Sequence, residues 1–331
     1  MSRIKSLLLL SVLTLALVPW SFAAVVQYAA GTCLPRLRSF PTITGALAAN
    51  PAPNVVFVCP GTYNEQITIT NGVTLEGITS GDSDQAIIAP PAGGLTASAL
   101  SSNLLEIVNF QILVTNASGP VNISNLTVDG TGNGVAASGS GNGLVGILYQ
   151  NSSGTVNRVT IQNETDNFNG VGISAEAASP ISVENSNIQN FDSIGIVAAF
   201  NATIKSNNLS GLSGCGCFGI FLQGNSTATV TGNFISATGT AITTGSKIVG
   251  SITGNTLISN GTGISPVSTT ISVTSNKILN ANTGIEFSCL ADPNVHSNTI
   301  VNASFGVAHV PAAVVTPNSY FGVGTIRSGG C

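Results

Sequence analysis

Five acidic residues stand in the middle of the sequence, at spacings that bring them close together if the chain coils regularly. Asp129, Glu164, Asp166 and Asp192 lie in segments that lead into three successive repeats, and Glu176 follows shortly after the second of them. Carboxylate oxygens with few basic neighbours suit Ca²⁺. We therefore identify these residues as a candidate cation or substrate cluster, with Ca²⁺ as the candidate cofactor. The alternative is that they only solvate surface loops.

On their expected cleft face, the repeats contain no pair of carboxyl groups at the spacing that glycoside hydrolysis needs, but they contain one pair of residues that could contact a sugar. Paired glycosidase carboxyl groups lie roughly 5–9.5 Å apart. The expected cleft face carries Glu176 and Glu286, which stand five coils apart, or about 24 Å at ~4.8 Å per coil. We therefore assign no catalytic residue. Phe221 and Gln223 on that face form a candidate carbohydrate-binding pair, because a ring can stack on a sugar and an amide can hydrogen-bond to it.

The elements that must position these side chains are short strands of a regular repeat. A small residue followed by Ile or Val recurs eight times at intervals of 21 to 26 residues: Gly146-Ile147, Gly172-Ile173, Gly195-Ile196, Gly219-Ile220, Ala241-Ile242, Gly263-Ile264, Gly284-Ile285 and Gly306-Val307. A second register, Ile/Val-x-x-Asn, falls between them and contains Asn207, Asn233, Asn255, Asn276 and Asn298. Two registers that stay in step predict stacked coils of about 22 residues, in which alternate residues point inward.

These repeats predict an all-β fold, a single-stranded right-handed parallel β-helix (a solenoid). Stacking at ~4.8 Å places the five asparagines above one another, so that their amides can bond to each other and to turn backbone groups. We expect a structural asparagine ladder there. The alternative is that they are ordinary turn residues.

The N-terminal part is expected to export the chain and cap the stack. Residues 1–23 have the features of a signal peptide: basic Arg3 and Lys5, an apolar run and small residues before a cleavage point after Ala23. Residues 24–331 are expected to form one domain, with an N-terminal cap at about 40–54, coils at about 55–310 and a C-terminal cap at 311–331. The cap should contain a short helix within 41–49, and the first strands should lie at 55–58, 66–69 and 73–75. We expect a secreted or periplasmic protein.

The charge balance excludes some partners. Only 7% of the residues are charged, and loss of Arg3 and Lys5 with the signal leaves 7 basic residues against 13 acidic ones, a net charge of −6. No basic patch is available for a phosphate backbone, so we expect no nucleic-acid partner. No later segment is long and apolar enough to span a membrane, so we expect no membrane span.

Six cysteines in an exported chain make disulfides plausible. Cys33 and Cys59 flank the first structural unit and are expected to pair. The pairing of Cys215, Cys217, Cys289 and Cys331 stays open, with a Cys215–Cys217 bridge or a bridge at the C-terminal end among the options.

The remaining basic side chains are expected to lie away from the cleft face. His296, beside Asn298, and His309, at an inward-facing position, are expected to have structural roles. Lys205, Lys247 and Lys277 are expected near the asparagine turns.

The segment Gly61-Thr-Tyr63-Asn-Glu65, after Val56-Phe-Val-Cys-Pro and before Val73-Thr-Leu-Glu-Gly77, resembles the opening coil of the pectate-lyase-like superfamily and matches the first pectinesterase signature. The later coils resemble the parallel β-helix repeats of NosD-like and carbohydrate-acting proteins. The resemblance covers roughly residues 40–310 and implies the fold. The later catalytic motifs of pectinesterases are missing, as are the clustered aspartates of polygalacturonases, and the lysines do not fit a pectate-lyase base.

We therefore predict a secreted β-helix protein that binds polysaccharide or a cell-surface glycan without catalysis. The alternative is a polysaccharide-acting enzyme, a lyase or glycoside hydrolase, that uses the Asp129–Asp192 loops. A periplasmic accessory role, as for NosD-like proteins, is suggested by repeat style alone.

Overall fold

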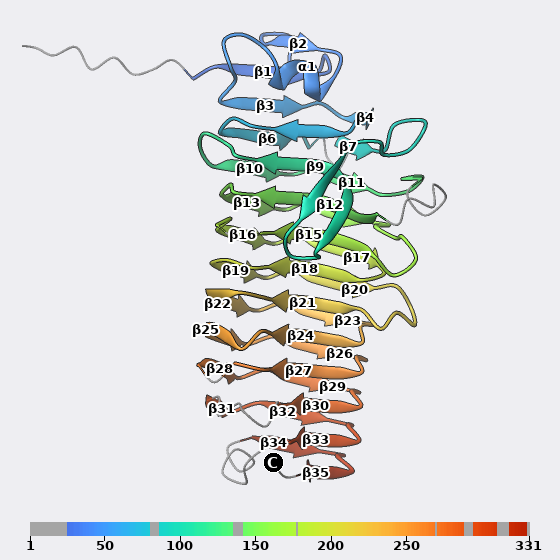
Figure 1. Cartoon of the computed structure of the whole chain (residues 1–331), viewed down its shortest axis with the longest axis vertical. Coiled ribbons are helices and arrows are strands. Elements are labelled where there is room, and N and C mark those ends of the chain that lie inside the picture. Colours follow the sequence, from blue (N-terminus) through green and yellow to red (C-terminus); the bar gives the residue numbers. More distant parts are fainter. Residues whose placement is uncertain are drawn as a thin grey trace, which may run out of the picture.

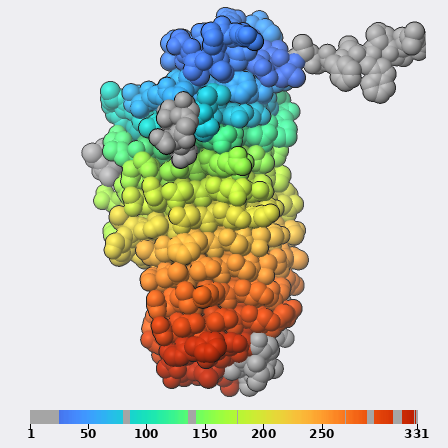
Figure 2. Space-filling model, turned by 180° about the vertical axis from the view of Figure 1, so that it is seen from behind, coloured from blue at the N-terminus to red at the C-terminus, as the bar shows by residue number. Residues whose placement is uncertain are grey.

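The computed structural model describes residues 25–79, 86–134, 142–176, 178–268, 270–287, 294–309 and 318–329. Its strands stack in parallel along one long axis, so that each coil contributes one strand to each of three sheets (Figure 1). In the space-filling view the coils appear as successive bands of colour from one end of the molecule to the other (Figure 2). The predicted parallel β-helix is confirmed. The predicted signal peptide lies outside the described residues.

We call the three sheets A, B and C, in the order in which each coil visits them. Sheet A contains β1 (Gln27–Ala30), β2 (Arg38–Phe40), β3 (Val55–Val58), β6 (Val73–Gly77), β10 (Val121–Ser124), β13 (Gly154–Asn157), β16 (Ile181–Glu184), β19 (Ala202–Lys205), β22 (Asn225–Thr231), β25 (Lys247–Thr253), β28 (Ile271–Thr274) and β31 (Asn294–His296). Sheet B contains β4 (Gly61–Asn64), β7 (Ala86–Ala89), β11 (Thr127–Asp129), β14 (Thr160–Gln162), β17 (Asn187–Phe191), β20 (Asn208–Gly211), β23 (Phe234–Ser236), β26 (Thr256–Ile258), β29 (Lys277–Leu279), β32 (Thr299–Val301) and β34 (Ser319–Phe321).

Sheet C contains β5 (Ile67–Ile69), β9 (Glu106–Thr115), β12 (Gly143–Gln150), β15 (Gly170–Ala175), β18 (Ile194–Ala198), β21 (Phe218–Leu222), β24 (Thr240–Thr244), β27 (Thr262–Pro266), β30 (Thr283–Glu286), β33 (Phe305–Ala308) and β35 (Thr325–Ser328). One further strand, β8 (Ser98–Ser101), pairs with β9 in antiparallel fashion and stands outside the stack. The last strands of sheets B and C pair with β32 and β33, so the coils continue into the segment that the sequence assigned to a C-terminal cap.

The geometry of sheet C explains why a small residue precedes Ile or Val in each repeat. Ile147, Ile173 and Ile196 pair in register and are fully buried. The glycine before each of them faces the neighbouring coil so closely that a Cβ atom on Gly172 would lie 2.7 Å from Ile188 Cγ2 and 2.6 Å from the Gly195 carbonyl oxygen. A larger residue would separate the coils, so the repeat demands a small residue at this position.

The short helix α1 (Ile43–Leu47) closes the N-terminal end of the core, as predicted. The hydroxyl of Thr42 accepts a hydrogen bond from the Gly45 amide, and the carboxylate of Glu65 accepts bonds from the amides of Ile43 and Thr44 at 2.8 and 2.9 Å. These contacts satisfy amides that the helix itself leaves free. Glu65, the last residue of the pectinesterase-like signature, therefore has a structural role here. No helix among the described residues is long and apolar enough to cross a membrane.

The asparagine ladder lies in the turns from sheet A to sheet B and is confirmed. Asn207 donates to the Oδ1 atom of Asn233 from its backbone nitrogen (2.9 Å) and from Nδ2 (3.0 Å), and the same pair of bonds links the later asparagines. Each Nδ2 atom also reaches a carbonyl of the preceding coil, as Asn233 does with Ile204 at 3.0 Å. The ladder is longer than predicted, because Ser186 begins it and Asn318 extends it.

Cys33 and Cys59 form the expected disulfide, with Cα atoms 5.6 Å apart. A second disulfide joins Cys215 and Cys217, one of the options that the sequence left open. Cys289 and Cys331 lie outside the described residues.

Replacing Asn255 by Leu should lower the free energy of unfolding by several kcal/mol, since each buried polar group left unpaired costs about 1–3 kcal/mol. Asn255 is 1% exposed, accepts two bonds from Asn233 and donates to Val230 and Asn276. Thermal and urea unfolding would measure the loss. The matched control is Asn208→Leu, which removes an exposed asparagine at the start of β20, next to the ladder residue Asn207, and should change stability little. Equal melting temperatures for Asn255→Leu and wild type would contradict a stabilising ladder.

Peptide mapping of the mature protein without reduction should recover Cys33 linked to Cys59. The paired Cys33→Ser and Cys59→Ser variant should lose roughly 3 kcal/mol of stability in the chain-entropy model for a loop of this size. Alkylation that labels both thiols in the native protein would refute this pairing.

Candidate functional site

Four of the five acidic residues singled out in the sequence lie where the chain passes from sheet B to sheet C. Asp129 ends β11, Glu164 and Asp166 lie between β14 and β15, and Asp192 lies between β17 and β18. The strands β11, β14 and β17 are neighbours in sheet B, so the four carboxyl groups belong to three adjacent coils. The structure therefore places them along one edge, but it gives each of them different partners.

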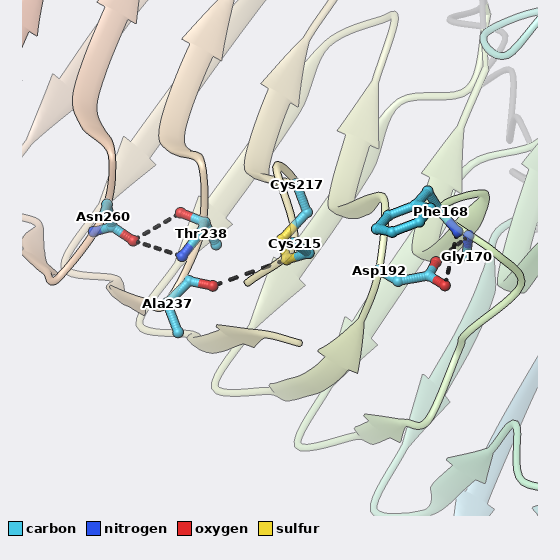
Figure 3. The surroundings of a disulfide bond; sticks show 8 residues. All are labelled: Phe168, Gly170, Asp192, Cys215, Cys217, Ala237, Thr238 and Asn260. Carbon is cyan, nitrogen blue, oxygen red and sulfur yellow. Dashed lines mark hydrogen bonds between the residues drawn. A yellow bond between two sulfur atoms is a disulfide. The ribbon is translucent and has the colours of Figure 1, made fainter. Parts of the chain in front are cut away.

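Asp192 holds the loop of the preceding coil in shape (Figure 3). Its Oδ2 atom accepts hydrogen bonds from the amides of Asp166 (2.8 Å) and Phe168 (3.0 Å), and its Oδ1 atom accepts one from Gly170 (2.6 Å). Three donors already occupy both oxygens of this buried carboxylate. Asp192 is therefore a loop-organising residue in this structure.

Asp129 is similarly occupied. Its carboxylate accepts bonds from the amide and hydroxyl of Thr131, from Gln162 Nε2 (2.9 Å) and from Asn163 Nδ2 (3.0 Å). Partial burial alone would raise the pKa of Asp129, but hydrogen bonds from Asn163, Thr131 and Gln162 outweigh it and hold the pKa below its ordinary value. Asp129 is thus a stable anion that ties two coils together.

Glu164 has the opposite environment. It is 1% exposed, and neither carboxyl oxygen has a hydrogen-bond partner among the described residues. The carboxyl group fits between Gly130 and Gly146, where added Cβ atoms would lie 2.8 Å from Oε2 and 2.9 Å from Oε1. Burial, reinforced by the negative charge of Asp129, raises the pKa of Glu164 well above its ordinary value. The register of β14 with β17 sets Glu164 opposite the buried ring of Phe191 in the next coil, so it fills a core position.

Two carboxyl groups do influence each other at the edge of sheet C. Burial and the charge of Asp192 raise the pKa of Asp166, and burial and the charge of Asp166 raise the pKa of Glu106 at the start of β9. The sequence analysis missed Glu106, because it precedes the regular repeats and reaches this edge only through the long strand β9.

Glu176 does not join the other four acids. It follows the last residue of β15, so it lies at the opposite end of that strand from Asp166. Its oxygens accept bonds from the Ser102 amide (2.8 Å) and from Gln150 Nε2 (3.2 Å). Within the described part of the chain, no three His, Cys, Asp or Glu side chains gather as ligands for a metal ion. The expected convergence of five carboxylates is therefore not found, and the geometry offers no site for Ca²⁺ there.

A hairpin explains why Glu176 is buried. Residues 98–107, with β8 at their start, lie across the outer face of sheet C (Figure 1). They cover an apolar cluster on that face, formed by Val108, Phe110, Leu113, Val145, Leu148, Val171, Ile194 and Val197. Asn103 donates to Ser174 and to the Ala175 carbonyl, and Gln150 donates to the Leu100 carbonyl at 2.7 Å. Beyond this cover, the outer face of sheet C becomes accessible again at β21, where Phe218 is exposed.

The predicted carbohydrate pair lies where this cover ends. Phe221 and Gln223 line an open hollow of about 490 Å³ together with Asn225, Ser246 and Lys247. We call this site the Phe221 hollow. The ring of Phe221 lies beside the ring of a second phenylalanine, Phe218. The two ring centroids are 5.6 Å apart, and the ring planes meet at 34°. Sequence alternation would have pointed Phe218 inward, because it lies two residues before the buried Ile220. The structure instead aligns it with Ile194 of the outer apolar cluster, so the alternation is broken at Gly219.

Two expectations about basic residues are corrected. Lys247 begins β25, at the turn from sheet C to sheet A, and lines the Phe221 hollow rather than an asparagine turn. His309 is exposed rather than inward-facing, with Nδ1 3.9 Å from a carboxylate oxygen of Glu286. Its backbone has a φ of 56°, so the chain leaves the strand there and the inward–outward alternation ends.

Glu164 should make the stability of the folded protein depend on pH, and its burial determines that stability falls as the pH rises. Its pKa is raised in the folded state, so the folded protein binds this proton more tightly than the unfolded chain, whose glutamate pKa is about 4.3. The stabilisation is complete below that unfolded value and is lost as the pH rises toward the folded value. Melting temperatures between pH 5 and 8 should fall more steeply for wild type than for Glu164→Gln. Glu76→Gln, at a half-buried position of β6, should keep the wild-type slope; identical slopes for all three would show that Glu164 does not titrate with folding.

Solved structures with the same fold include carbohydrate-active proteins. The catalytic domain of a GH87 α-1,3-glucanase variant, in complex with tetrasaccharides, aligns with a TM-score of 0.55 at 14% identity over 93% of this chain and 66% of that domain. The Agl-KA catalytic domain aligns with a TM-score of 0.51 at 12% identity over 81% of this chain and 51% of that one. The A-module of a mannuronan C-5 epimerase from Azotobacter vinelandii gives 0.45 at 14% identity, with coverages of 84% and 91%. This chain therefore spans about two thirds or less of the two better-matching domains, and the likeness shows the fold.

A comparison with curated proteins finds no match. The family model described as "Right handed beta helix region" matches residues 146–318, which is more than half of the sequence. These residues contain the later coils of the stack and the asparagine ladder described above. The chain belongs to the right-handed β-helix family.

Proposed function

We propose that this protein binds polysaccharide through the open part of the sheet C face, without cleaving it. The observation that carries the proposal is the Phe221 hollow, where the half-buried ring of Phe221, flanked by the exposed ring of Phe218, stands beside an amide, a hydroxyl and an ammonium group. Sugar rings present apolar C–H faces and polar edges, so a site of this composition complements them. The tetrasaccharide complex of the α-1,3-glucanase, which shares the fold, agrees with a glycan ligand.

The carboxyl groups of the sheet C face favour binding over cleavage. Glu176 is buried beneath the hairpin, and both its oxygens have donors. Glu286 lies three coils beyond Phe221 in the register of sheet C, about 14 Å away along the stack at ~4.8 Å per coil. The two carboxyl groups of this face, those of Glu176 and Glu286, stand five coils apart, about 24 Å at ~4.8 Å per coil, which is wider than the roughly 5–9.5 Å of a glycosidase pair. The hollow itself contains no carboxylate.

One observation favours a second candidate function, glycoside hydrolysis. Glu106 and Asp166 lie near enough for the charge of Asp166 to raise the pKa of Glu106, and raised carboxyl pKa values are typical of general acids. This pair lies where the sheet C strands begin, beside the hairpin. A substrate bound there would have to lie across the coils that the hairpin covers.

Phe221→Ala should weaken glycan binding about tenfold, the equivalent of the ~1.4 kcal/mol that a well-placed aromatic contact contributes. Phe234→Ala is the matched control, because Phe234 is an exposed phenylalanine of sheet B outside the hollow. A glycan array would find the ligand, and titration of that ligand would compare the variants. Equal weakening by both substitutions, or no glycan bound by wild type, would refute the proposal.

The same glycans should be assayed for new reducing ends and for unsaturated uronates. We expect neither product. Release of reducing ends by wild type, abolished in Asp166→Asn, would instead establish the hydrolase.

A further inference from the structure

The outer face of sheet A carries a continuous row of short polar side chains. The strand registers align one outward residue per coil: Thr74, Asn122, Thr155, Ser182, Thr203, Thr229, Ser251, Ser272 and Asn294. Neighbouring members stand ~4.8 Å apart, the spacing of paired strands. The row is therefore a periodic array of hydroxyl and amide groups parallel to the long axis of the molecule.

Part of this row forms one wall of a groove of about 650 Å³, which we call the sheet A groove. The groove runs across β10, β13, β16, β19 and β22, and its other wall comes from the turns that enter these strands, including Pro120, Pro180 and Asn201. None of the residues that line it is charged. It shares no lining residue with the Phe221 hollow, which lies at the turn from sheet C to sheet A and touches only the first residues of β22 and β25.

The groove offers groups for a ligand to bind. The hydroxyls of Thr203 and Thr229 have no hydrogen-bond partner within the described part of the chain, whereas Thr155 already donates to Asn122 at 2.9 Å. The rings of Pro120 and Pro180 add apolar surface beside them. Polar edges next to apolar faces, without charge, complement an uncharged sugar chain and would leave an ionic group unpaired.

We propose that the sheet A groove binds an uncharged linear polysaccharide that lies along the helix axis, with one sugar unit for each coil. The rise of one coil is close to the length of a hexose in an extended β-linked chain, so successive sugars meet equivalent side chains. This inference extends the proposed glycan binding to a second site, and each site can fail without the other.

The length of the groove sets the length of the ligand. Its five strands are separated by four steps of ~4.8 Å, about 19 Å in all. Affinity should therefore rise with chain length up to about four or five sugar units and then level off.

The experiment is calorimetric titration of the full-length mature protein with cello-, xylo- and manno-oligosaccharides, each from disaccharide to octasaccharide. The groove variant is Thr203→Val with Thr229→Val, which removes two hydroxyls and keeps the β-branched shape. The control is Thr253→Val with Thr274→Val, on the outer face of sheet A beyond the groove, where the two hydroxyls bond to each other at 3.1 Å and are not free for a ligand. Melting temperatures would verify that both variants fold. Phe221→Ala reports on the other site.

The groove variant should lose at least about tenfold in affinity, as expected for two lost hydrogen bonds, while the control pair keeps wild-type affinity for the same oligosaccharide. Loss in Phe221→Ala alone would overturn the groove and leave the proposed function standing. Equal loss in the groove and control variants, affinity that keeps rising beyond the hexasaccharide, or no binding of any of these uncharged chains would also overturn it.

Discussion

Each coil of this protein can satisfy its buried polar groups only through the next coil. The turn from sheet A to sheet B removes backbone amides and carbonyls from water, and the asparagine ladder supplies their partners through bonds of 2.8–3.1 Å. Because each Oδ1 atom accepts two bonds from the preceding asparagine, the coils must stay in strict register. That register fixes which side chains face outward on every sheet, and both candidate binding sites depend on it.

The repeat itself made the fold predictable. The Gly-Ile pattern reflects the close approach of neighbouring coils, as at Gly172, which only a small residue allows. The Ile-x-x-Asn pattern reflects hydrogen bonding in the turn, as at Asn233, which requires an amide side chain. The outward position of Phe221 followed from the same alternation. The N-cap at Thr42 and the disulfide at Cys33 also act locally or at the ends of the first structural unit, where sequence signals are strong.

The candidate site was less predictable because its main determinants interrupt the repeat. Alternation gives the face of a residue but not its partners, so nothing in the sequence showed that Asp192 would bind three amides or that Glu164 would fill a core position beside Phe191. The hairpin that buries Glu176 arises from an irregular segment, and its covering of sheet C is a tertiary contact without a periodic signal. Lys247 was predicted to lie near an asparagine turn because it is close to Asn255 in sequence. The long strand β25 separates the two residues and places Lys247 at the opposite end of that strand.

The hairpin over sheet C also changes how the stack can come apart. In a simple solenoid each coil touches only its neighbours, so the structure can peel one coil at a time from either end. Here residues 100–103 are bonded both to Gln150 and to the stretch Ser174–Glu176, which ties β9, β12 and β15 into one unit. Those coils must open together or not at all, whereas no such strap is found among the described residues of the coils after β21. The molecule is therefore mechanically uneven along its length, with a cooperative block near its N-terminal end and a part beyond it that can fray by single turns.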